Sequence, residues 1–161
     1  MATVKRSSLR GNSRNRPKIF IVAHNRILCA QLKKVITEDI ELEAVVLQEL
    51  PNMGARTIIE KFEEYASECS YAIAILTPDD PIGDSTTTCL RARPNVIFEL
   101  GWFFRHLGRD RVMILRQEGV DLATFSDIEG VLYISFERDI TEVAEQVKNE
   151  LALAAVCLVK S

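Results

Sequence analysis

The amino-acid sequence predicts an α/β protein with a flavodoxin-like, doubly wound sheet of five parallel strands. Short runs of aliphatic and β-branched residues recur along the chain, and segments with apolar residues at helical spacing separate them. Each run is apolar at successive positions rather than at alternate ones, so both faces of each strand are expected to be buried. Strands that alternate with helices in this way favour a parallel sheet covered on both sides.

The first half of the chain supplies three of these strands. KIFIVA (18–23) is the first buried strand, and ELEAVVL (41–47) is the second. Between them, residues 26–38 carry Ile, Leu and Val at helical spacing and predict a helix. The segment QELPNMGA contains Pro and Gly and interrupts the chain before a second helix, near 56–68. YAIAIL (71–76) is the third buried strand.

The second half contains a long irregular segment and the remaining elements. Residues 77–93 show no convincing periodicity, and we interpret them as a loop, whose length is typical of functional or of disordered loops. A helix is expected over about 94–107, followed by a strand at RVMIL (111–115). VLYIS (131–135) is the fifth strand, and the last helix is expected over about 140–156.

Charge divides the chain into two parts. Residues 1–17 contain five basic residues, no acidic one and no apolar period. This composition predicts a disordered basic N-terminal arm, followed by a single α/β domain over residues 18–161. All 23 acidic residues lie in the domain, against 15 of the 20 basic ones, and this balance argues against a dedicated nucleic-acid-binding role.

Composition also excludes several classes of protein. The four cysteines are widely scattered and the chain has only two histidines, so neither a zinc site nor a disulfide framework is expected. This cysteine usage fits a reducing, cytoplasmic environment. No apolar run reaches the roughly 20 residues that span a bilayer, so no membrane association is expected. A GxGxxG sequence is missing, which argues against a dehydrogenase-like use of NAD as a cofactor.

The predicted architecture indicates where a ligand would bind. Ligands of open α/β sheets bind beyond the carboxyl ends of the strands, where residues 23–25, 48–56 and 77–93 are expected to meet. Gly54 and Arg56 open a helix there. They predict either a phosphate site, with Arg56 adding charge, or a tight turn with a solvated arginine.

Further polar residues follow the strands at the same edge. Asp79 and Asp80 either contact a ribose hydroxyl or form a strand-end turn, and a metal site there would lack a third ligand. Arg91 and Arg93 pair either with a diphosphate or with neighbouring acids. His24 lies near the edge and is a candidate for substrate binding, although a single histidine in such a place is more often incidental.

One acidic residue, Glu99, interrupts the apolar stretch NVIFELGWFF (95–104). On a helical wheel Glu99 falls beside the core-facing stripe, on the same flank as Asn95. Pro94 favours the first helical turn, which puts Glu99 in the second turn, near the ligand edge. We interpret Glu99 as a functional acid with Asn95 beside it. The alternative is that Glu99 merely borders the core and reaches water.

Two aromatic residues of the same helix, Phe98 and Trp102, fall opposite the core-facing stripe. Large aromatic side chains on an outer face are costly to leave in water. They predict a contact surface for self-association, unless residues 77–93 fold over them.

Four stretches of the chain resemble, in order, the bacterial TIR-like family of predicted nucleotide-binding domains: RTIIEKFEEYA (56–66), AILTPDD (74–80), RARPNVIFELGWFFRHLGRDRV (91–112) and DIEGVLYI (127–134). The resemblance covers roughly residues 18–138. It implies a TIR-like fold and hydrolysis of NAD+ at the nicotinamide–ribose bond. Glu99 would be the catalytic glutamate, because NVIFELG matches the motif that carries it. The resemblance also implies an effector of antiphage defence that assembles into oligomers or filaments, with a fused or partner sensor of cyclic nucleotides.

Two other function classes stay open at this point. One is a TIR-type interaction module that assembles with its own kind and has no turnover. The other is an enzyme similar to the nucleoside deoxyribosyltransferases, which share the fold type and a glutamate nucleophile. Glu99 in the matched motif favours NAD+ hydrolysis, since a pure adaptor does not need that residue. The product could be linear or cyclic ADP-ribose.

Overall fold

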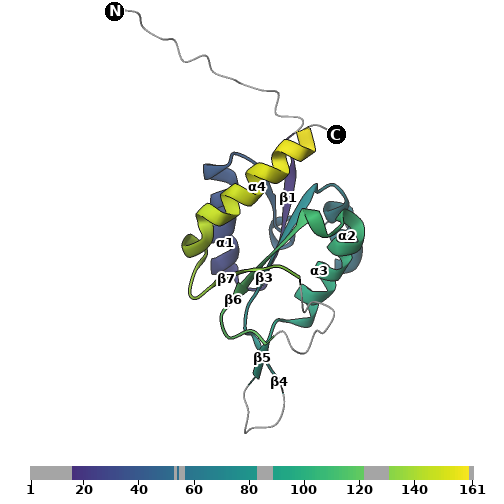
Figure 1. The fold of residues 1–161 in the computed structure, drawn as a ribbon. Helices are drawn as coiled ribbons and strands as arrows, with labels where there is room; N and C mark the ends of the chain where they lie inside the picture. The colour runs from purple at the N-terminus through teal and green to yellow at the C-terminus, as the bar shows by residue number, and fades with distance from the viewer. Residues whose placement is uncertain (1–15, 53, 55–56, 83–88, 122–130, 160–161) are drawn as a thin grey trace, which may run out of the picture.

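The computed structural model describes residues 16–52, 54, 57–82, 89–121 and 131–159 (Figure 1). Within these residues five strands form one sheet in the order β2-β1-β3-β6-β7. The strands are β1 (Lys18–Val22), β2 (Glu43–Val45), β3 (Tyr71–Leu76), β6 (Val112–Gln117) and β7 (Ile134–Phe136). Each neighbouring pair in the sheet is parallel. The predicted doubly wound, five-stranded parallel sheet is therefore confirmed.

The strands at the two edges of the sheet are shorter than predicted. β2 begins at Glu43 rather than at residue 41, because Glu41 has a φ of 59° and turns the chain out of extended conformation. β7 begins at Ile134. Tyr133, just before it, lies under the Arg116 guanidinium at 5.1 Å, and its hydroxyl oxygen accepts a hydrogen bond of 3.1 Å from Arg116 Nη1. One residue of the predicted strand 131–135, Tyr133, thus precedes β7 and contacts a side chain of β6.

The segment predicted as an irregular loop, residues 77–93, contains a hairpin. β4 (Asp80–Ile82) and β5 (Cys89–Arg91) pair antiparallel, with Asp80 opposite Arg91. Three-residue strands are too short to show alternation, and proline is uncommon inside strands. The expectation of a loop without secondary structure was wrong for these six residues.

Local sequence explains where each helix begins. α1 (Arg26–Lys34) is capped by Asn25, whose side-chain oxygen accepts hydrogen bonds from the next backbone N–H groups. α2 (Ile58–Ser67) begins with a reciprocal capping box between Thr57 and Glu60. α3 (Pro94–Leu107) has Pro94 in its first turn, as predicted. A short 3₁₀ turn leads into α4 (Ala144–Val159), and a π-helical turn (Val35–Asp39) follows α1.

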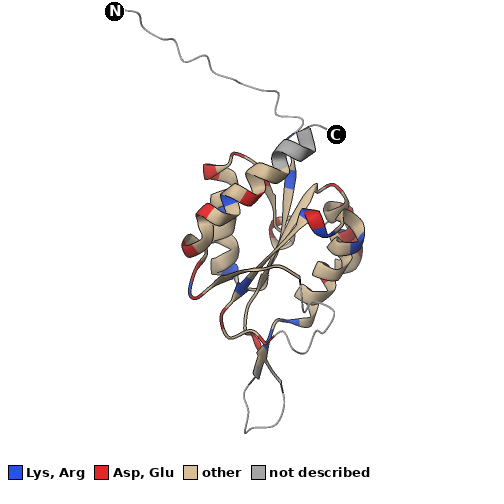
Figure 2. Cartoon of the chain, in the orientation of Figure 1, with Lys and Arg blue, Asp and Glu red and all other residues tan. Residues whose placement is uncertain are grey.

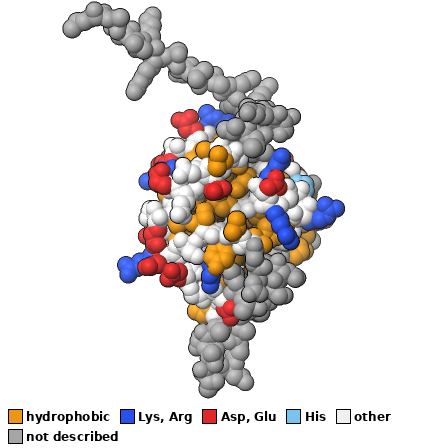
Figure 3. All heavy atoms as spheres, viewed as in Figure 1, with side chains coloured by type: hydrophobic (Ala, Val, Ile, Leu, Met, Phe, Trp, Pro, Cys, Tyr) orange, Lys and Arg blue, Asp and Glu red, His pale blue; other side chains and the backbone are white. Residues whose placement is uncertain are grey.

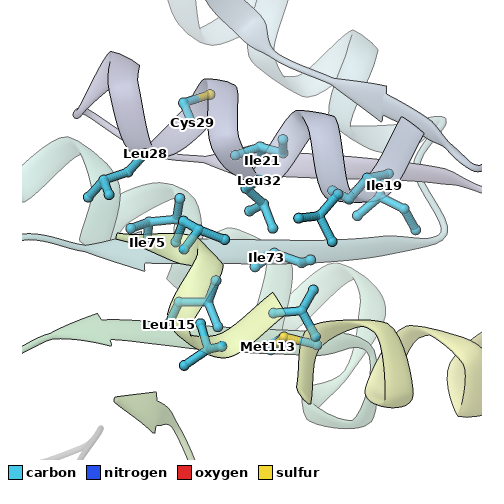
Figure 4. Close-up of a cluster of buried hydrophobic side chains, with 14 of the residues drawn as sticks. Ile19, Ile21, Leu28, Cys29, Leu32, Ile73, Ile75, Met113 and Leu115 are labelled. Atoms are coloured by element: carbon cyan, nitrogen blue, oxygen red, sulfur yellow. The ribbon is translucent and has the colours of Figure 1, made fainter. Parts of the chain in front are cut away.

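The helices form two layers, one on each face of the sheet (Figure 1). α1 and α4 cover one face, where aliphatic side chains from β1, β3 and β6 fill the core (Figure 4). α2 and α3 cover the other face, and their core contains small alanines of β3 together with large aromatic rings. The successive residues of β3 are all buried, which confirms that this strand has core on both faces.

The aromatic core fixes α2 and α3 to the sheet. Phe103 of α3 is fully buried, and its ring lies 5.0 Å from that of Phe20 on β1 and 5.7 Å from that of Phe62 on α2. Edge-to-face and tilted ring pairs at such distances are favourable. Because α3 carries Glu99, this cluster also determines where that carboxylate lies.

Acidic and basic residues are spread along the helices and loops of the domain (Figure 2), and the face shown in Figure 3 presents both charged and hydrophobic side chains. Among the helices of the described residues, none combines the length and the apolar character that a bilayer crossing requires. The predicted basic arm, residues 1–17, lies outside the described residues apart from its last two. Of these, Arg16 donates a hydrogen bond to the carbonyl oxygen of Glu41.

Candidate functional site

Glu99 lies on the flank of α3, as the helical wheel predicts. Val96, Leu100 and Phe103 of the same helix are buried against the sheet, whereas Glu99 is only partly buried. α3 follows β3 and the hairpin in the chain, so its first turns lie at the carboxyl edge of the sheet. This is the edge where ligands of such sheets bind.

Two cavities meet at Glu99. The larger, here called the polar cavity, has a volume of about 550 Å³. It is lined by Ala23, His24, Leu47, Gln48, Asn52, Ile58, Lys61, Arg93, Asn95, Val96 and Glu99. The second, the apolar cavity, has a volume of about 450 Å³ and is lined by Ile58, Ile59, Phe62, Pro94, Asn95, Phe98 and Glu99. Both volumes lie in the range of small-molecule sites. One carboxylate therefore borders a polar compartment and an apolar one.

Burial raises the pKa of the Glu99 carboxyl from its ordinary value of 4.5 to about 7. The cause is desolvation, which disfavours the charged form of an acid. Carboxyls perturbed in this way inside a cleft are candidates for catalytic groups. A cationic ligand beside Glu99 would therefore stabilise the ionised form that burial disfavours.

The raised pKa predicts a stability change with a defined pH dependence. Because the folded-state pKa exceeds the unfolded one, ionisation of Glu99 destabilises the folded protein as pH rises from 4.5 to 7, and the loss is complete above that range. We expect Glu99→Gln to be more stable than the parent by about 2–3 kcal/mol at pH 8 and by less than about 1 kcal/mol at pH 4.5. Urea denaturation at both pH values measures this difference. A gain of equal size at both would contradict the assigned cause.

Three of the residues predicted for substrate binding line the polar cavity together with Glu99. They are His24 from the β1–α1 turn, Arg93 at the N-cap of α3, and Asn95 in its first turn. Gly54 adopts a φ of 78° in an exposed bend and does not line either cavity. Its positive φ explains why glycine occupies this turn. Arg56 lies outside the described residues, so its predicted role remains a prediction.

The remaining predicted residues belong to the hairpin rather than to the walls of these two cavities. Thr77 donates a hydrogen bond to the Asp79 carboxylate, and Asp80 forms an ion pair of 3.9 Å with Arg93. Arg91 lies opposite Asp80 in the hairpin. Its Nε is buried and has no hydrogen-bond partner among the described residues. Arg93 therefore makes the contact with a neighbouring acid that was one of its two predicted alternatives.

Lys61 is a wall residue that the sequence did not indicate. Its Nζ donates hydrogen bonds to the carbonyl oxygen of Leu50, at 2.6 Å, and to the side-chain oxygen of Asn52, at 3.0 Å. These bonds attach the segment after β2 to α2 and put a positive charge in the wall of the polar cavity. Gln48 and Asn52 lie in a segment that was predicted to reach this edge, but no local pattern marks Lys61.

Trp102 is partly buried, so the expectation that it lies on an exposed outer face holds only in part. The Trp102 ring packs edge-on against Phe62 of α2 at 5.2 Å and stacks on His106 at 4.5 Å. The neighbouring helix α2 covers part of this ring, which a wheel drawn for one helix does not show. Phe98 is 55% exposed and lines the apolar cavity.

Comparison with known proteins identifies the family. The family described as "CAP12/Pycsar effector protein, TIR domain" matches residues 18–138. The chain belongs to this family. The match confirms the resemblance drawn from the sequence motifs and covers the whole sheet, the polar cavity and Glu99.

Individual relatives place the domain within longer proteins. The protein YuaY of Escherichia coli (strain K12) is 43% identical over 142 residues, which are 86% of this chain and 46% of YuaY. The Pycsar effector protein PaPycTIR of Pseudomonas aeruginosa is 38% identical over 96 residues, 60% of this chain and 30% of PaPycTIR. The chain thus spans less than half the length of either relative.

A solved structure is also similar to the chain. It is the CMP N-glycosidase BcmB of Clostridium botulinum, with 16% identity and a TM-score of 0.48 over 84% of this chain and 98% of that one. At this distance the likeness carries no information on the substrate.

Proposed function

We propose that this TIR domain hydrolyses NAD+ at the nicotinamide–ribose bond, with Glu99 as the catalytic residue. The observation that carries the proposal is the position of the Glu99 carboxylate, which is partly buried at the junction of the polar and apolar cavities. Membership of the Pycsar effector TIR family supports a nucleotide-directed role for this site.

The chemistry of the bond explains the need for one carboxylate. Nicotinamide leaves as a neutral molecule and needs little acid assistance. The ribose that remains acquires oxocarbenium character, as in glycoside cleavage. The Glu99 carboxylate stabilises the positive charge at the anomeric carbon, or attacks that carbon to form an ester that water then hydrolyses. In both routes the ionised form of Glu99 is the active one.

The two cavities fit the two sides of the scissile bond. The nicotinamide ring of NAD+ is flat, aromatic and cationic, and it suits the cavity walled by Phe98, Pro94 and Phe62, where aromatic faces and the Glu99 carboxylate favour a cation. The ribose and its phosphate suit the polar cavity, where Asn95 and Lys61 offer hydrogen bonds and charge. Glu99 borders both compartments and therefore lies beside the bond that joins ring and sugar.

The decisive experiment is an assay of nicotinamide release from NAD+ by the purified protein, run at several protein concentrations. Parallel reactions with deoxynucleosides test for release of the base. We expect release from NAD+ and none from deoxynucleosides. Base release from deoxynucleosides would instead favour a deoxyribosyltransferase-like enzyme. If neither substrate is cleaved at any concentration by this chain or by the longer protein with its activating signal, the domain is a non-catalytic interaction module.

The pKa of Glu99 predicts the pH profile of this reaction. Since the active form is ionised and the pKa is about 7, kcat/KM should rise by about tenfold per pH unit below that value and level off above pH 8. The bound nicotinamide ring is positively charged and lowers the pKa of the adjacent acid, so the kcat profile should bend at a lower pH. Steady-state rates between pH 5.5 and 9 measure both. A kcat/KM that does not change across this range would show that ionisation of Glu99, with its raised pKa, is not required for the reaction.

The same family membership suggests the biological setting. We propose an effector role in antiphage defence, in which a cyclic-nucleotide signal reaches the TIR domain through another domain or a partner protein. Self-association into oligomers or filaments belongs to this proposal. Because the chain spans less than half of YuaY and PaPycTIR, activation is a property to be tested on the longer protein.

A further inference from the structure

A third cavity adjoins the polar cavity on the side away from Glu99. It has a volume of about 400 Å³ and lies between the β1–α1 turn and the segment that follows β2. Its walls are formed by Ala23, His24, Arg26, Cys29, Ala30, Val46, Gln48 and Glu49. Ala23, His24 and Gln48 also line the polar cavity, so the two spaces lie side by side. Together they make an elongated site with Glu99 near one end.

Charged side chains line both of these cavities. His24 stands between the two cavities, and Arg26 lies in the third cavity just beyond it. Glu49 contributes a carboxylate to the same cavity, and its Oε2 is paired with Lys33. A carboxylate has acceptor capacity for further donors, such as hydroxyl groups. The Glu99 carboxylate thus lines one cavity, Arg26 and the Glu49 carboxylate line the other, and His24 lies where the two meet.

The remaining wall of the third cavity is small and chemically inert. Burial raises the pKa of the Cys29 thiol to about 11, so the thiol is neutral at pH 7. A neutral buried thiol behaves as a small apolar group. Ala30 and Val46 add apolar surface. This lining suits a flat heterocycle rather than a second reacting group.

Sheet topology puts Glu49 directly after the strand next to β1, where an acid can contact the ribose of a dinucleotide. β2 is the neighbour of β1, so the segment after β2 lies beside the β1–α1 turn. In doubly wound sheets that bind dinucleotides, an acid after the second strand accepts hydrogen bonds from a ribose, and the diphosphate lies at the first strand–helix turn. Glu49 and the His24–Arg26 turn occupy these two places.

We infer that the third cavity is the subsite for the adenosine half of the substrate. His24 and Arg26 contact the diphosphate, Glu49 accepts hydrogen bonds from the adenosine ribose, and the base lies against Ala30 and Val46. This inference rests on the proposed function, since it assigns the far end of an NAD+ molecule whose nicotinamide ribose lies at Glu99. It adds a specificity role for Glu49, Arg26 and Ala30.

The test compares NAD+ with nicotinamide mononucleotide, which has the same scissile bond but no adenosine half. Ala30 is exposed on α1, so a bulky side chain there fills the cavity without entering the core. We expect Ala30→Trp to raise the KM for NAD+ about tenfold or more and to change the KM for the mononucleotide by less than about twofold. Lys34→Trp, on the same helix and outside the cavity, should leave both constants unchanged.

A second variant tests the ribose contact without adding bulk. Glu49→Gln should raise the KM for NAD+ by about three- to tenfold, leaving that for the mononucleotide unchanged. If Ala30→Trp alters both substrates equally, or alters neither, the adenosine subsite is ruled out.

Failure of the proposed function would be recognised separately. If the parent protein cleaves neither substrate, binding of AMP measured by NMR or calorimetry still tests the subsite. AMP that binds the parent and not Ala30→Trp supports it, and AMP that binds both equally, or neither, overturns it.

Discussion

Glu99→Gln is expected to lower the rate of nicotinamide release by about a thousandfold while the domain keeps its fold. The substitution is nearly isosteric, and it removes the negative charge that the oxocarbenium-like transition state requires. A neutral amide cannot form the covalent ester either, so both routes described above are lost. The measurement is nicotinamide release at pH 8, where Glu99 is ionised in the parent protein.

The control for this variant is Glu63→Gln on α2. Glu63 is exposed, and it lines neither the polar nor the apolar cavity. Its substitution changes the net charge by the same amount and should leave the rate within about twofold, as surface substitutions do. A folded Glu99→Gln protein that keeps a tenth or more of the parent rate would show that Glu99 is not the catalytic residue.

Phe103→Ala is expected to produce the largest loss of stability, about 3–5 kcal/mol. The Phe103 ring is fully buried and contacts the rings of Phe20, Phe62 and Trp102. Its removal leaves a cavity between α3 and the sheet, which the surrounding rings only partly fill. The measurement is urea denaturation followed by circular dichroism, with the free energy of unfolding compared at pH 7.

Phe98→Ala provides the matched comparison on the same helix. The Phe98 side chain is 55% exposed, so its removal should cost less than about 1 kcal/mol. Equal losses for the two variants would mean that the aromatic core does not anchor α3. A folded domain in which Phe103→Ala also retains full activity would show that the position of Glu99 does not depend on this cluster.

The parts of the fold that local periodicity encodes were determined by the sequence alone. The run YAIAIL predicted β3 with its correct bounds, because six successive apolar residues followed by a turn are typical of a strand buried on both faces. Pro94 and the apolar stripe behind it predicted both the start of α3 and the flank on which Glu99 lies. The family also followed from motifs that are contiguous in the chain.

The parts that depend on contacts between distant segments could not be predicted in this way. The three-residue strands of the hairpin are held by pairing with each other, and neither has a pattern of its own. Trp102 packs against Phe62, a residue 40 positions earlier on another helix, and is partly buried by this contact.

The chemistry of the site divides in the same manner. The sequence determined that an acid, Glu99, lies at the ligand edge, because helix period and strand order suffice for that. Only the tertiary structure decided that its carboxyl is desolvated, with a pKa of about 7, because desolvation depends on every neighbour packed around it. Tertiary structure likewise decided that Lys61 closes one wall and that Glu49 stands beyond His24, since both depend on how α2 and β2 lie beside β1.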